Sequence, residues 1–138
     1  MNLFRWLFIG CFVLVLAGCR ARTVTSSAPA VAPAAERTIA HQEIGFRSRR
    51  NLEEHYAKHG SEFGGISQTD YLRLAQSLRD APAGGDILEA VRSADSITTR
   101  FDRKTGAFLA FNEDLTIRTF FKPNDGERYF KRQLQREH

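Results

Sequence analysis

The spacing of apolar residues changes once along this chain, near Ser96, and this change predicts the fold class. Between about residues 49 and 81 apolar side chains recur every three or four positions, which is typical of amphipathic helices. After Ser96 they alternate with polar side chains, which is typical of strands. Helices followed by strands predict an α+β domain. We expect N-terminal helices packed on a small antiparallel sheet of three or four strands, with a short C-terminal helix.

Two helices are expected before the sheet. The first covers residues 49–59, with Gly60 as its stop, and one stripe of it carries Leu52, His55, Tyr56 and His59. The second begins at a capping box, Ser67 to Asp70, and ends before Pro82. The stretch 86–94 follows two glycines and is interpreted as a short helix or turn.

Three strands and a last helix are expected after residue 95. The strands cover residues 96–102, 107–112 and 115–121, and the helix covers 127–136. Alternation in the first strand places Arg100 on the face opposite Ile97 and Phe101. In the third strand it places Arg118 and Thr119 on opposite faces.

The N-terminus has the form of a signal peptide. Arg5 precedes an apolar run over residues 6–16, which is shorter than the roughly 18 to 20 residues of a membrane span. Leu16-Ala17-Gly18-Cys19 resembles the bacterial lipoprotein signal, in which the cysteine is diacylated and becomes the first mature residue. The resemblance implies that residues 1–18 are removed and that Cys19 is the lipid anchor. The residue after the cysteine is Arg20 and not Asp, which resembles lipoproteins that are sorted to the outer membrane and not retained in the inner membrane. The alternative is an ordinary signal peptide with an incidental cysteine.

Residues 19–40 are rich in Ala, Ser, Thr and Pro and are interpreted as a flexible tether, and residues 41–138 as the domain. The domain is nearly neutral, with 16 basic and 15 acidic residues, but residues 98–138 carry 9 basic and 6 acidic ones. An anion-binding face is therefore expected in the C-terminal third. Since Cys11 lies in the removed segment, the mature chain cannot form an internal disulfide or a cysteine-based zinc site.

The histidines of the first helix are the strongest candidates for chemistry. His55 and His59 share one helix face with Lys58 beside them. Three interpretations remain open: a metal pair, a packed histidine with a helix cap, and an acid/base pair that titrates near neutral pH. His59 abuts Gly60 at an end where the helix would fray, so we favour His55 as the essential acid/base group.

Further candidates lie in the C-terminal part. Arg100, Arg118 and Lys122 are cations able to hold a phosphate, and Thr119 is a hydroxyl donor. Tyr129 and Phe130 interleave with basic residues, as in nucleic-acid-binding surfaces. The structural alternatives are a solvated sheet face and a docking helix.

A set of short motifs resembles one family. The set consists of His55-x-x-Lys58-His59-Gly60 with Glu62-Phe63-Gly64, then Tyr71-x-x-x-Ala75, Arg100-Phe101-Asp102-x-x-Thr105-Gly106-x-Phe108, Ile117-Arg118-Thr119-Phe120-Phe121-Lys122-Pro123 and Tyr129-Phe130. Together they resemble the C-terminal nuclease domains of bacterial polymorphic and contact-dependent toxins, the barnase, EndoU, colicin E5, colicin D and RelE-like superfamily. The resemblance implies a barnase/colicin D-like fold and cofactor-free, metal-independent RNA cleavage by the ribose 2′-hydroxyl. It implies RNA and a cognate inhibitor protein as partners.

The leading hypothesis is thus a lipid-anchored, toxin-type ribonuclease domain, a hydrolase held at the membrane through Cys19. Its expected catalytic residues are His55, Lys58, His59, Arg100, Thr119 and Lys122. Its expected substrate-binding residues are Arg118, Tyr129 and Phe130. The alternative is a non-catalytic envelope lipoprotein that binds a protein partner through its sheet face. The two hypotheses differ in whether the first helix brings its histidines next to Arg100, Thr119 or Lys122.

Overall fold

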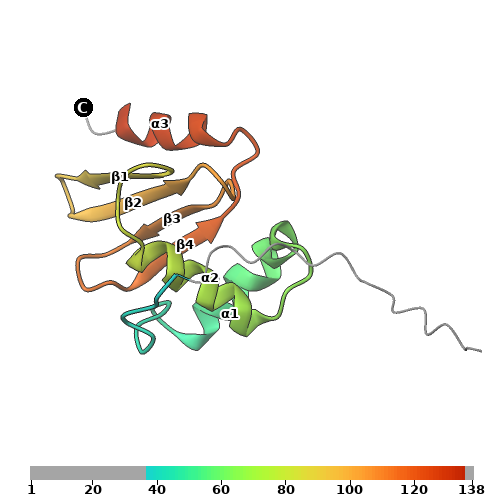
Figure 1. Ribbon diagram of the computed structural model, residues 1–138. Coiled ribbons are helices and arrows are strands. Elements are labelled where there is room, and N and C mark those ends of the chain that lie inside the picture. The colour runs from blue at the N-terminus through green and yellow to red at the C-terminus, as the bar shows by residue number, and fades with distance from the viewer. Residues whose placement is uncertain (1–36, 136–138) are drawn as a thin grey trace, which may run out of the picture. The chain divides into compact units, whose positions relative to one another are not determined.

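A computed structural model describes residues 37–135, so the predicted signal peptide, Cys19 and most of the tether lie outside the described range. The described residues form three α-helices, a 3₁₀ helix and a four-stranded antiparallel sheet, which confirms the α+β class (Figure 1). The elements in chain order are α1 (Arg49–His59), η1 (Gly60–Phe63), α2 (Gln68–Asp80), β1 (Ile87–Arg92), β2 (Ile97–Asp102), β3 (Phe108–Phe111), β4 (Ile117–Phe121) and α3 (Glu127–Gln135). Within residues 37–135, no helix is long and apolar enough to cross a membrane.

The sheet is a meander in the order β1-β2-β3-β4, with α1 and α2 on one side and α3 on the other (Figure 1). Apolar side chains fill the space on both sides of it. The cluster under α1 and α2 includes Tyr71, Leu78, Leu109, Ile117 and Phe120. The cluster under α3 includes Ile97, Phe101, Phe108, Ala110 and Phe130. Because both faces are covered, the sheet offers its edges to partners more readily than its faces.

The expectation of a short helix or turn over residues 86–94 is wrong. Ile87–Arg92 forms the edge strand β1, which pairs with β2 along its whole length. The sequence Ile-Leu-Glu-Ala-Val-Arg does not alternate strictly because Ile87 and Leu88 pack on opposite sides of the sheet, each against apolar groups. Pairing with β2 decides the conformation here. Ser96, with φ of 55°, closes the hairpin.

Strand β4 contains an irregularity that strict alternation does not predict. Ala110 pairs with Thr119, whereas the next residue of β3, Phe111, pairs with Ile117, so the register shifts by one residue. As a result Ile117 and Phe120 both belong to the cluster under α1 and α2, although they are three positions apart. An extra residue of this kind bends a strand and re-aims the side chains beyond it.

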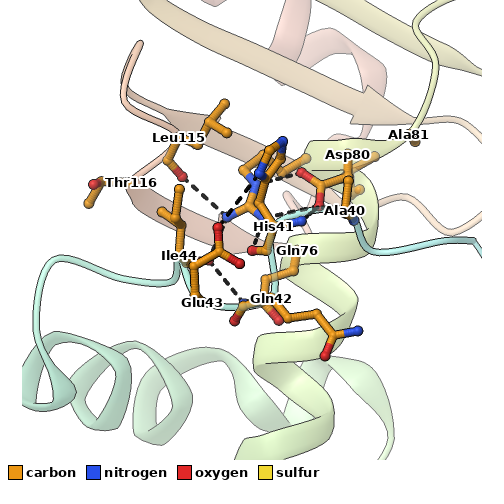
Figure 2. A network of polar contacts seen from close by, with 12 residues as sticks. Ala40, His41, Gln42, Glu43, Ile44, Gln76, Asp80, Ala81, Leu115 and Thr116 are labelled. Carbon is orange, nitrogen blue, oxygen red and sulfur yellow. Dashed lines mark hydrogen bonds and ion pairs between the residues drawn. The ribbon is translucent and has the colours of Figure 1, made fainter.

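Residues 37–46, here called the strap, lie against the C-terminal end of α2 (Figure 2). Asp80 accepts hydrogen bonds from the backbone N–H groups of Ala40 and His41, at 2.9 and 3.0 Å. Arg79, whose side chain is fully buried, pairs with Asp80 and donates to the carbonyl oxygens of His41 and Ile44. The strap then lies beside β4, where the N–H of Ile117 donates to the carbonyl of Gly45.

Further contacts extend the strap's attachment. Arg37 forms an ion pair of 2.8 Å with Asp102, whose side chain is buried at the end of β2. Gln76 donates to the carbonyl oxygens of Gln42 and Ile44. Residues 37–40, which the sequence assigned to the tether, thus contact the folded domain.

Candidate functional site

The site begins where α1 ends. The helix has the predicted bounds, but Gly60 keeps a helical φ of −57° and the chain continues into η1. Glycine is needed at this position because a Cβ would lie 2.6 Å from the ring of Tyr56. The left-handed conformation typical of a glycine cap occurs instead at Gly64, with φ of 87°. The extra turn carries Glu62 back toward the end of α1.

Glu62 connects the end of α1 to the end of β4. Its Oε1 lies 2.7 Å from Nδ1 of His59, and its Oε2 accepts the backbone N–H of Lys122 at 2.6 Å. Glu62 belongs to one of the motifs that carry the family resemblance, but the sequence alone suggested no role for it. Only its spacing of three from His59 pointed to the contact. The carboxylate occupies Nδ1 of His59, so Nε2 is the nitrogen that remains to exchange a proton.

His59 is firmly held, so the expectation that it sits at a fraying end is wrong. Its side chain is only 14% exposed. Besides the contact with Glu62, its ring lies 5.1 Å from the ring of Phe121. The 3₁₀ continuation after Gly60 is the physical reason, because it fixes the turn that follows the histidine.

His55 lies one turn before His59, with 6.2 Å between the two ring centroids. Its ring is 5.1 Å from that of Phe46 on the strap. Its Nδ1 is shielded from solvent and has no hydrogen-bond partner within residues 37–135. Partial burial, and then the positive charges of His59 and Lys58, lower the pKa of His55 below 6.5. The lowered pKa favours the neutral imidazole, which is the form able to accept a proton.

Two lysines lie near this pair. Lys58 is exposed on α1, and its charge acts on His55. Lys122 follows β4, and its Nζ lies 5.0 Å from the centroid of the Phe63 ring. Glu62 contacts both His59 and the backbone N–H of Lys122, so the structure brings His55, His59 and the backbone of Lys122 together at the end of β4, while the Lys122 ammonium lies over Phe63.

Arg100 lies elsewhere, although sequence reasoning grouped it with the histidines. As predicted, it lies on the face of β2 opposite Ile97 and Phe101, but its guanidinium reaches the end of α2. Nη1 donates to the carbonyl oxygens of Leu78, at 3.0 Å, and of Ala81 and Arg79. Nε donates to Glu89 at 2.6 Å. These contacts satisfy orphan carbonyls at a helix C-terminus, which is a structural use of the charge.

Arg118 and Thr119 lie in β4, nearer its start than Lys122. The side chain of Arg118 is exposed, and its Nη1 donates to Oδ1 of Asn112, on the β3–β4 turn, at 3.3 Å. Arg118 and Lys122 are four positions apart, which in a strand corresponds to about 13 Å. Thr119 is partly buried and pairs with Ala110. Arg118 is therefore directed toward the β3–β4 turn, away from the histidines.

Tyr129 and Phe130 differ in environment. Phe130 is 4% exposed and packs with Phe101 in the core under α3, so its ring is not available to a substrate. Tyr129 is partly buried, with ring centroids 4.9 Å from Phe108 and 5.3 Å from Phe121. Phe121 also contacts His59, so Tyr129 lies one ring away from the histidines.

Residues 37–135 contain no group of three or more His, Cys, Asp or Glu side chains placed to hold a metal ion. The histidine pair with Glu62 carries groups that are chemically able to transfer protons. Comparison with protein-family models and with curated proteins gave no match.

Proposed function

We propose that the domain is a metal-independent ribonuclease of the toxin type, lipid-anchored at the cell envelope through Cys19. The observation that supports this most directly is the side-by-side placement of His55 and His59, with Glu62 holding His59 against the end of β4. Two imidazoles at such a distance are able to act on the two oxygens of one phosphodiester. This arrangement joins the continuous segment α1–η1 to the residue after β4, which is 60 positions beyond Glu62.

The environments of the two histidines suggest their roles. His55 favours the neutral form, so it acts as the general base and removes the proton of the ribose 2′-hydroxyl. The 2′-oxygen attacks phosphorus, and the bond from phosphorus to the 5′-oxygen breaks. His59, with Nδ1 held by Glu62, donates a proton from Nε2 to the leaving 5′-oxygen. The products are a 2′,3′-cyclic phosphate and a free 5′-hydroxyl.

Positive charge is also needed, because the phosphorane carries more negative charge than the diester. We assign this role to Lys58, whose charge acts on His55, and to Lys122, whose backbone N–H is held by Glu62. Arg100 is omitted because its donors are used at the end of α2. Thr119 keeps its proposed role of orienting the phosphate from β4.

The alternative function, binding of a protein partner, has one observation in its favour. Val91 on the edge strand β1 is 57% exposed. The sheet faces proposed for that role are covered by helices, so a partner would have to pair with the edge of β1. A cognate inhibitor protein remains part of the proposal for the ribonuclease.

The test is cleavage of total RNA by the purified full chain in detergent and EDTA. Single variants His55→Ala and His59→Ala should each lose about 100-fold or more in rate, within the range of acid/base catalysis. His41→Ala is the matched control, because it removes a histidine that is not part of the His55/His59 pair. The imidazole of His41 lies 3.7 Å from Glu43, and its backbone N–H, which the substitution keeps, donates to Asp80. Mass spectrometry should find 2′,3′-cyclic phosphate ends. Rates within threefold of the wild type in a folded His55→Ala/His59→Ala double variant would reject the mechanism.

A further inference from the structure

Five partly buried rings lie in a continuous row that crosses four parts of the fold. The row is formed by Phe46, His55, His59, Phe121 and Tyr129. Successive ring centroids are separated by 5.1, 6.2, 5.1 and 5.3 Å. The rings come from the strap, α1, β4 and α3. We call this set the ring row.

Core packing accounts for only part of the ring row. Phe46 packs against the cluster under α1 and α2, and Phe121 and Tyr129 pack against the cluster under α3. The two histidines connect the rings of one side to those of the other, because His55 lies beside Phe46 and His59 lies beside Phe121. The row therefore runs past the end of β4, and each of its members is only partly buried.

Basic groups accompany the row. Lys58 lies near His55, and Lys122 follows Phe121 in the chain, with its Nζ 5.0 Å from the centroid of the Phe63 ring. At the other end, Cζ of Arg132 lies 5.8 Å from the centroid of the Tyr129 ring, while its Nη1 pairs with Asp125. Arg128, the residue before Tyr129, is exposed on α3. Rings flanked by cations bind single-stranded nucleic acids, because every base has a face that stacks and every nucleotide a phosphate.

We propose that the ring row is a binding track for single-stranded RNA, in which a base next to the scissile phosphate stacks on Tyr129 with Arg132 beside it. The position of the scissile phosphate at His55 and His59 rests on the proposed function. In a duplex the base faces are occupied by neighbouring bases, so the track should discriminate against double-stranded RNA. This adds a substrate class and a subsite to the acid/base pair.

The test measures binding separately from cleavage. The probe is a fluorescent 2′-O-methyl oligonucleotide, which lacks the attacking hydroxyl, and the readout is fluorescence anisotropy of the full chain in detergent and EDTA. Tyr129→Leu should weaken binding about tenfold, whereas Tyr129→Phe, which keeps the ring, should bind within about twofold of the wild type. A duplex of the same sequence should bind at least about tenfold more weakly than the single strand.

Arg132 provides a second pair of variants that does not disturb core packing. Arg132→Gln should weaken binding about threefold at low salt. Arg49→Gln should leave it unchanged, since Arg49 is likewise an exposed arginine paired with one carboxylate but lies at the start of α1. If melting curves show that Tyr129→Leu is unfolded, the track is tested by the comparison of Arg132→Gln with Arg49→Gln and by the comparison of duplex with single strand.

The possible outcomes separate this inference from the proposed function. Unchanged binding in folded Tyr129→Leu and Arg132→Gln, or duplex binding equal to that of the single strand, would overturn the track even if the wild type cleaves RNA. Ring-dependent binding of the probe by a wild type that cleaves no RNA would support the track and reject the ribonuclease.

Discussion

Replacing Arg100 by leucine should destabilise the domain without removing the proposed chemistry from molecules that stay folded. The guanidinium is only 12% exposed and donates to the carbonyl oxygens of Leu78, Arg79 and Ala81, while it pairs with Glu89. In the wild type, Cζ of Arg100 lies 5.5 Å from the centroid of the Phe111 ring, and leucine keeps an apolar side chain at this position. It leaves the three carbonyl groups at the end of α2 without this donor.

The size of the effect follows from these contacts. One hydrogen bond from a charged donor contributes about 1.5 to 3 kcal/mol, and here one nitrogen is shared among three acceptors. The pair with Glu89, which is 30% exposed, adds less than about 1 kcal/mol. We therefore expect a loss of about 2 to 4 kcal/mol in the free energy of unfolding. For a domain of this size that lowers the melting temperature by about 8 to 30 °C.

Urea denaturation of the full chain, followed by circular dichroism, measures the loss. Arg73→Leu is the control, because Arg73 is an exposed arginine of α2 whose nearest carboxylate is 3.8 Å away, and it should change stability by less than about 0.5 kcal/mol. The cleavage rate of Arg100→Leu, measured well below its melting temperature, should stay within about threefold of the wild type. A variant as stable as the wild type but inactive would refute this reasoning and place Arg100 in the catalytic site.

Three further predictions concern protons and the lipid. Burial raises the pKa of Asp80, but the hydrogen bonds from Arg79 and the strap lower it more, so the folded pKa lies below 3.8. Stability should therefore fall as the pH drops below 3.8, and urea denaturation should show a smaller fall for Asp80→Asn. The ring protons of His55 should titrate with a midpoint below 6.5 by NMR, because burial and the nearby positive charges favour its neutral form; a midpoint above 6.5 would contradict its role as the base. Cys19→Ser should abolish palmitate incorporation and release the protein from the membrane fraction, and continued labelling would reject the lipoprotein hypothesis.

Local patterns in the sequence sufficed for most of the secondary structure. The stripe in residues 49–59 and the capping box at Ser67 predicted α1 and α2, because apolar periodicity and capping hydrogen bonds act within a few residues. Alternation predicted β2, β3 and β4, which the structure confirms with small shifts at their ends. The pairing of His55 with His59 was also predictable, since a spacing of four places side chains on one helix face.

Tertiary structure decided the features that depend on distant partners. Residues 87–92 became a strand because β2 offered an edge, and the register shift in β4 re-aimed Phe120 in a way that no local pattern encodes. Arg100 was predicted from its charge to bind phosphate, but packing placed it at the end of α2. Glu62 acquired a role only because η1 and β4 meet at His59. A charged side chain is able to reach any of several acceptors, so its type suggests what it can bind, and the folded chain determines which acceptor is near.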